Sequence, residues 1–96
     1  MIYETLLVDF SDNIATITLH RPDKMNALNT QMRAELIDAV KDMGRKARVV
    51  VITGTGRAFC SGQDLGDGVD PANTDLERVL RDEYNPMLHA ILDCPV

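Results

Sequence analysis

Aromatic residues are scarce in this sequence. Two tyrosines, two phenylalanines and no tryptophan are spread over 96 residues. The hydrophobic interior must therefore be built from Leu, Ile, Val and Met side chains. Positive charge is also scarce: the net charge is −5 and no basic cluster is longer than Arg45-Lys46. This balance argues against a nucleic-acid partner or an anionic membrane surface.

Long apolar runs and closely spaced cysteines are absent too. No stretch approaches the roughly 20 apolar residues that span a bilayer, and the residues after Met1 lack the basic start and apolar core of a signal peptide. Cys60 and Cys94 lack metal-ligand spacing and are expected to be reduced thiols. We therefore expect a cytoplasmic protein without membrane association and without a metal site.

Three segments have the patterning of strands. Residues 3–10 and 14–19 alternate between apolar and polar positions, and the turn residues 11–13 between them predict a β-hairpin. Residues 49–53 are apolar on both faces, which predicts a strand covered on both sides.

Two segments have helical spacing. A helix is expected from a cap at Asn29 or Thr30 to a C-terminal cap at Gly44, with charged residues such as Arg33 and Glu35 off its apolar face. Residues 76–92 predict a second helix, which Pro86 should kink or restart. The order β, β, α, β, loop, α is an α/β pattern.

The loop at residues 54–65 follows the apolar strand and holds three glycines, Gly54, Gly56 and Gly62. Glycine permits positive φ and close approach of the backbone, so such a loop can aim amide hydrogens at a developing negative charge. It lacks the third glycine and the immediate helix of a dinucleotide-binding fingerprint.

Several reactive side chains also have ordinary interpretations. Cys60 is expected to be a small buried thiol rather than a nucleophile. Asp64 is expected to cap a turn rather than act as a base, and His89 to be a structural or surface residue. For Lys24, a solvated loop cation and a phosphate ligand are both open.

Three pieces in this order resemble the N-terminal third of the crotonase superfamily, the enoyl-CoA hydratase/isomerase family. They are residues 19–22 (LHRP), 26–29 (NALN) and 51–65 (VITGTGRAFCSGQDL). The resemblance covers residues 1–96, read as the N-terminal part of one crotonase-like domain. Gly62-Gln63-Asp64-Leu65 and the later Tyr84-Asn85-Pro86 are most similar to the epoxyphenylacetyl-CoA isomerase branch.

The resemblance implies an α/β, crotonase-like ββα spiral fold, present here only in part, and a homo-oligomer, trimeric or hexameric, in the full-length protein. It implies an acyl-CoA thioester partner, and no cofactor beyond the CoA of the substrate. Gln63 would supply a backbone N–H to an oxyanion hole, while the second N–H, from a glycine, and the proton-transferring carboxylates would follow residue 96. The implied substrate-binding residues lie in the two loops: Lys24, Met25, Ala27, Ser61, Gly62, Gln63, Asp64 and Leu65.

Sequence analysis thus predicts an acyl-CoA hydratase or isomerase that stabilises an enolate. Two alternatives stay open: a non-catalytic module that binds CoA or a protein partner, and a truncated inactive fragment.

Overall fold

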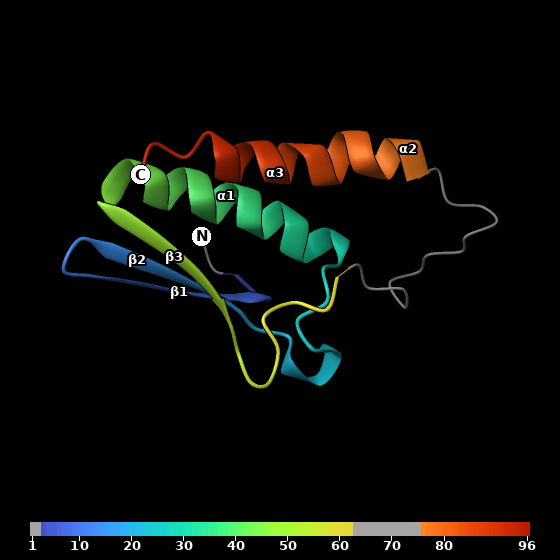
Figure 1. Ribbon diagram of the computed structural model, residues 1–96, viewed down its shortest axis with the longest axis horizontal. Coiled ribbons are helices and arrows are strands. Elements are labelled where there is room, and N and C mark those ends of the chain that lie inside the picture. Colours follow the sequence, from blue (N-terminus) through green and yellow to red (C-terminus); the bar gives the residue numbers. More distant parts are fainter. Residues whose placement is uncertain (1–2, 63–75) are drawn as a thin grey trace.

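A small sheet, one long helix across it and a second helical segment make up the fold in the computed structural model, which describes residues 3–62 and 76–96. The strands are β1 (Leu6–Ser11), β2 (Ile14–Leu19) and β3 (Val49–Gly54). Helix α1 (Thr30–Lys46) covers one face of the sheet, and the segment that ends in α3 (Asn85–Leu92) runs beside α1 (Figure 1).

The sheet has the order β1-β2-β3, with β1 antiparallel and β3 parallel to β2. The predicted hairpin is confirmed, and its turn residues Asp12 and Asn13 both have positive φ, which Asp and Asn tolerate. The parallel pairing of β2 and β3 requires a crossover, and α1 provides it. Consequently the loops after β2 and after β3 leave the sheet at the same end.

Helix α1 begins as predicted, because the Asn29 side chain caps it by accepting a hydrogen bond from the Met32 N–H at 2.8 Å. Its predicted end is wrong. The helix continues past Gly44 to Lys46, with Ala47 as the C-cap. Gly44 serves packing instead: a Cβ there would lie 2.9 Å from the Cys94 Sγ and 3.2 Å from Pro95 Cδ. The glycine lets residues 94–95 close against α1.

The core between the sheet and the helices is aliphatic, as the composition predicts. Fully buried Ile17, Leu19 and Met32 lie at its centre, and Met87 and Ala90 join it from α3. Met43 packs with Ala15 and Ala47 in a smaller cluster at the end of α1. Two methionines of α1, Met32 and Met43, thus contribute to the interior that the composition predicts.

Two charged residues of α1 are buried, contrary to prediction. Arg33 is only 4% exposed and Glu35 only 8% exposed. Buried charges need hydrogen-bonding partners, and each of these has several. Glu35 accepts hydrogen bonds from the backbone N–H and hydroxyl of Thr5, from the Glu4 N–H and from the Gln31 amide. It thereby fixes the segment before β1 to the helix.

The hydrogen bonds to Glu35 predict that its contact with the segment before β1 weakens in acid. Burial alone would raise the pKa of Glu35, but hydrogen bonds from Thr5 and Glu4 outweigh it and hold this pKa below its usual range. A depressed carboxyl pKa gives stability that is present above about pH 4.3 and is lost as the pH falls through the lower, folded-state value.

We expect Glu35→Gln to lower the free energy of unfolding at pH 7 by about 1–3 kcal/mol and to flatten its decline below pH 4.3. Urea unfolding from pH 3 to pH 7 measures both effects. Asp12→Asn, which removes a carboxylate from an exposed turn, is the control. If the free energy of unfolding of Glu35→Gln declined below pH 4.3 as steeply as that of the parent protein, Glu35 would not be the source of the acid sensitivity.

The prediction that strand 49–53 is covered on both sides is wrong for this chain. Val49 and Val51 are 49% and 41% exposed, on the face of the sheet that α1 does not cover. Leu7 and Ile14 of the neighbouring strands share this open face through the strand register. One apolar face of β3 thus packs under α1. No layer among residues 3–62 and 76–96 covers the other face.

The predicted second helix is one helical segment with an irregular middle: α2 (Leu76–Val79), the π-helical turn η2 (Leu80–Tyr84) and α3. Pro86 stands in the first turn of α3, where its missing N–H costs least. The proline therefore restarts α-helical geometry after a π-turn, as predicted. Among the described residues, no helix is both long and apolar enough to span a membrane.

Candidate functional site

Two loops lie side by side at one end of the sheet (Figure 1). The first, residues 20–28, follows β2 and contains the single turn η1 (Pro22–Lys24). The second, beginning at residue 55, follows β3. Parallel strands deliver both loops to the same edge, which is where α/β proteins gather ligand-binding groups.

Asn26 joins the two loops from inside. Its side chain is fully buried, and its Nδ2 donates to the carbonyl oxygens of Thr55 and Ala58, both at 2.9 Å. Its Oδ1 accepts from the Arg21 N–H at 2.8 Å. One amide thus satisfies three backbone groups in both loops. Asn26 stands within the 26–29 motif, but the sequence pattern alone predicts no role for it.

Backbone hydrogen bonds continue the contact toward the glycine loop. The Ser61 N–H donates to the Met25 carbonyl at 3.1 Å, and the Leu28 N–H donates to the Gly62 carbonyl at 2.7 Å. Gly62 has φ +112°, a region that residues with a Cβ rarely adopt. The loops therefore meet through main-chain groups.

Gly54 lets the second loop turn back on itself. A Cβ at this position would lie 2.5 Å from the Phe59 carbonyl oxygen and 2.6 Å from that of Ala58. Both neighbours are backbone atoms, so the turn has no room for a side chain here. The glycine at the end of β3 is thus required by close approach of the backbone, as the sequence predicts.

The structure brings five of the predicted substrate-binding residues into this pair of loops. Met25 and Ser61 are hydrogen-bonded to each other, Gly62 is bonded to Leu28, and Ala27 is buried beside them. Lys24 closes η1 and is exposed. A surface hollow of about 350 Å³ lies between the loops, lined by Pro22, Met25, Thr55, Gly56, Arg57 and Ala58. The predicted residues Gln63, Asp64 and Leu65 lie outside the described residues.

A buried ionic cluster, which the sequence pattern does not predict, lies next to these loops. Arg33 of α1 donates to the Leu28 carbonyl at 3.0 Å, to the Glu83 carboxylate at 2.6 Å and to the Tyr84 hydroxyl at 3.1 Å. Its guanidinium also lies 4.5 Å from the centroid of the Tyr84 ring. Hydrogen bonds from Arg33 hold the pKa of Glu83 below its usual range. Arg33 thereby fixes the first loop to the turn η2.

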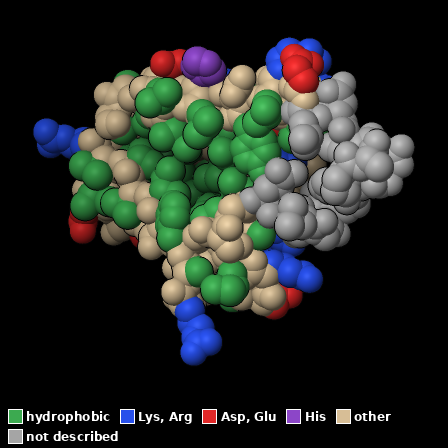
Figure 2. Space-filling model, turned by 45° about the vertical axis from the view of Figure 1, so that its right-hand side comes forward, with side chains coloured by type: hydrophobic (Ala, Val, Ile, Leu, Met, Phe, Trp, Pro, Cys, Tyr) green, Lys and Arg blue, Asp and Glu red, His purple; other side chains and the backbone are tan. Residues whose placement is uncertain are grey.

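An apolar hollow opens beside the second loop. Figure 2 shows hydrophobic side chains gathered around it, and its volume is about 120 Å³. The lining residues are Leu19, Leu28, Leu36, Ile52, Phe59, Cys60, Met87 and Ile91. Phe59 is 57% exposed at its rim. Cys60 is half-buried rather than buried, and its Sγ lies 3.9 Å from the Gly62 carbonyl oxygen.

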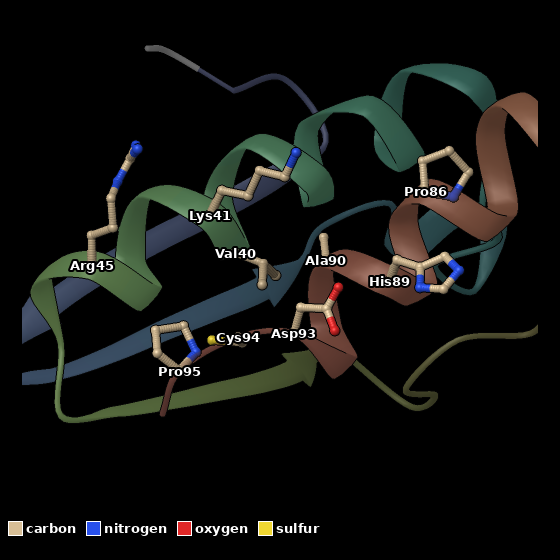
Figure 3. A pocket seen from close by; sticks show the side chains of 9 residues that line it. All are labelled: Val40, Lys41, Arg45, Pro86, His89, Ala90, Asp93, Cys94 and Pro95. Atoms are coloured by element: carbon tan, nitrogen blue, oxygen red, sulfur yellow. The ribbon is translucent and has the colours of Figure 1, made fainter.

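A further pocket, of about 420 Å³, lies between α1 and α3 (Figure 3). Lys41, Arg45, His89 and Asp93 line it with exposed side chains. None of the residues of the two loops lines it, so it is separate from the candidate site. His89 is a surface residue, as predicted.

No group of three or more potential metal ligands occurs in the part of the chain that the structure describes. The chemistry on offer at the candidate site is that of main-chain amides and carbonyls beside an apolar hollow.

The known proteins that this chain is similar to have related names. A family model described as enoyl-CoA hydratase/isomerase matches residues 9–96. A Rhodobacter capsulatus protein with the name probable enoyl-CoA hydratase is 53% identical over 96 residues, covering 100% of this chain and 37% of that protein. The 1,2-epoxyphenylacetyl-CoA isomerase of Escherichia coli is 36% identical over 97 residues, covering 96% of this chain and 37% of that enzyme.

Among solved structures, Pseudomonas aeruginosa AtuE superimposes with a TM-score of 0.80 at 33% identity, covering 96% of this chain and 37% of that one. The chain thus spans little more than a third of the length of the proteins it matches, and it matches them over nearly its whole length.

Proposed function

Because this chain belongs to the enoyl-CoA hydratase/isomerase family, we propose that the whole protein acts on the acyl-CoA thioester of a 2-enoyl-type acid. In this proposal it adds water to the double bond or shifts the double bond. Residues 1–96 supply the CoA-facing loops and half of an oxyanion hole.

The observation that supports this proposal is the backbone pairing of the two loops. The Leu28 N–H holds the Gly62 carbonyl at 2.7 Å, directly before the residue proposed as the oxyanion donor. An enolate formed from a thioester places negative charge on one oxygen. A fixed N–H that points at this oxygen lowers the barrier, because it needs no reorganisation during the reaction.

The other predicted residues have proposed roles in holding CoA. The carbonyls of Ser61, Gln63 and Leu65 would accept hydrogen bonds from the adenine, while Lys24 would offer a positive charge to a phosphate. Met25 and Ala27, with the hollow between the loops, would run beside the nucleotide and the pantetheine arm. Gly62 and Asp64 would shape the turn that carries Gln63.

The proposed reaction needs no metal and no organic cofactor, since CoA is part of the substrate. The general acid and base are proposed to follow residue 96, as does the second oxyanion donor. We also propose that the whole protein is a homo-oligomer, trimeric or hexameric.

An atom-level substitution tests the role of Gln63. Replacing Gln63 by its α-hydroxy acid analogue turns the backbone N–H into an ester oxygen while keeping the side chain. We expect kcat on 2-enoyl-CoA to fall by about 10²–10³ in the whole protein. Gln63→Ala keeps the N–H and should change kcat by only a few-fold. Equal rates for the ester and the parent enzyme would refute the oxyanion assignment.

A further inference from the structure

The pocket between α1 and α3 combines an apolar floor with charged walls (Figure 3). Val40 of α1 and Ala90 of α3 are both buried and lie at its base. Pro86, Cys94 and Pro95 complete the apolar lining. The volume of about 420 Å³ falls in the range of small-molecule sites, about 300–1,000 Å³, which join apolar walls to a few polar groups. The pocket therefore has the size and the lining of a ligand site.

The charged side chains stand on opposite walls of this pocket. Lys41 and Arg45 lie four residues apart on α1, so they share one side of the helix. His89 and Asp93 lie four residues apart at the end of α3, across the gap (Figure 3). One wall thus offers two cations, and the other offers a carboxylate and an imidazole.

The side chains of Lys41 and Asp93 have no structural partner. Among residues 3–62 and 76–96, they form no ion pair or hydrogen bond with each other or with any other residue. Arg45 has a long contact to Asp42, at 3.8 Å, and stands in the last turn of α1, where a cation compensates the helix dipole. Lys41 precedes that turn, so the dipole does not account for it. Opposite charges therefore line the pocket without pairing.

We propose that this pocket binds a small zwitterion, an α-amino acid with an aliphatic side chain. The carboxylate of the ligand binds Lys41 and Arg45, and its ammonium group binds Asp93 through charge-assisted hydrogen bonds. The aliphatic side chain lies on Val40 and Ala90. An anion alone would leave the carboxylate wall unpaired, and an amine alone would leave the cationic wall unpaired.

This inference is independent of the proposed function. None of the residues that line the pocket belongs to the two loops of the candidate site. Failure of one proposal therefore leaves the other standing, because amino-acid binding and turnover of 2-enoyl-CoA are measured separately.

Three probes separate the contributions of the two charges in the whole protein. They are L-leucine, 4-methylpentanoate, which is leucine without its ammonium group, and 3-methylbutylamine, which is leucine without its carboxylate. Saturation-transfer NMR detects weak ligands of large proteins and gives the dissociation constant of each probe by titration. We expect leucine to bind about 3- to 5-fold more tightly than either of the other two, since an exposed ion pair contributes no more than that.

Two substitutions locate the binding in this pocket. Lys41→Met should weaken leucine toward the affinity of 3-methylbutylamine, and Asp93→Asn should weaken it toward the affinity of 4-methylpentanoate. Both residues are exposed, so the fold should tolerate both changes. Lys46→Met is the matched control, because it removes an exposed lysine of the same helix that binds Asp42 and does not line the pocket. It should leave the dissociation constant of leucine unchanged.

The same measurements can overturn the proposal. Equal dissociation constants for leucine and for either of the other probes would refute a zwitterionic ligand. Leucine binding that neither Lys41→Met nor Asp93→Asn weakens would refute the pocket as its site, and so would the absence of saturation transfer to leucine.

Discussion

The polypeptide Met1–Val96 on its own is expected to convert 2-enoyl-CoA at least about 10⁴-fold more slowly than the whole protein. Loss of one oxyanion donor costs about 10²–10³ in rate, and loss of the general acid and base costs a further 10²–10⁴ or so. Both sets of groups are proposed to follow residue 96. The rate effects of catalytic groups that act together do not simply multiply, so we take the lower end of the product, about 10⁴, as the expected loss.

The decrease in the absorbance of the conjugated thioester measures this turnover. The whole protein at the same site concentration is the positive control. Residues 1–96 carrying Gly54→Ala are the control for trace contamination, because the second loop has no room for a side chain at this position. A rate for residues 1–96 near that of the whole protein would show that the catalytic carboxylates lie within this chain.

Size-exclusion chromatography and thermal melting of the same sample address the alternative of a stand-alone binding module. Such a module should be monodisperse and should melt cooperatively. The open sheet face, with Val49 and Val51 exposed, predicts self-association instead, because β3 is also an edge strand among the described residues.

Asn26→Asp is expected to be the most destabilising single-atom change in the candidate site. It leaves the shape unchanged but replaces the Nδ2 donor, which binds the Thr55 and Ala58 carbonyls, by a carboxylate oxygen. A fully buried carboxylate would then face two carbonyl oxygens. The Arg21 N–H would remain as a donor to its other oxygen, but the buried charge would have no cationic partner that the structure describes. Such a charge costs about 3–5 kcal/mol, so we expect a loss of this size in the free energy of unfolding at pH 7.

The sign of the pH dependence identifies the buried charge as the cause of the lost stability in Asn26→Asp. The buried environment disfavours the charged form and raises the pKa of the new carboxyl in the folded state above about 3.9, its value in the unfolded chain. The penalty is therefore present at pH 7 and is relieved as the pH falls through the raised value. Urea unfolding of the whole protein at pH 5 and pH 7 measures this difference.

Asn29→Asp is the matched control for this substitution. It makes the same atomic change at the N-cap of α1, where an aspartate accepts the Met32 N–H as well as asparagine does. We expect its stability to lie within about 0.5 kcal/mol of the parent protein. If Asn26→Asp and Asn29→Asp were equally mild, the two loops would not depend on the Asn26 donor.

The sequence predicts the local elements of this fold well, because each depends on short-range patterns. Alternation defines β2, turn residues define the hairpin, and Asn29 marks the start of α1. The parallel register of β2 and β3, which the structure shows, then brings the two motif loops together.

The sequence does not predict what depends on distant partners. Gly44 resembles a helix cap, but its role is set by Cys94 and Pro95, which pack against it. Arg33 and Glu35 fall outside the apolar pattern of α1, yet each is buried by partners far along the chain, Glu83 and Thr5 among them. Asn26 is likewise a common loop residue in sequence, and only the position of the second loop gives it two of its three partners.

The crossover through α1 has a kinetic consequence. The β1–β2 hairpin can form early, because its partners are close in sequence, whereas β2 meets β3 only after the whole of α1 has been spanned. The contacts between the loop at Asn26 and the loop at Thr55 lie beyond that pairing and should form last. Weakening them should therefore accelerate unfolding while leaving the refolding rate almost unchanged. The candidate site would then be the first region to open when the folded protein begins to unfold.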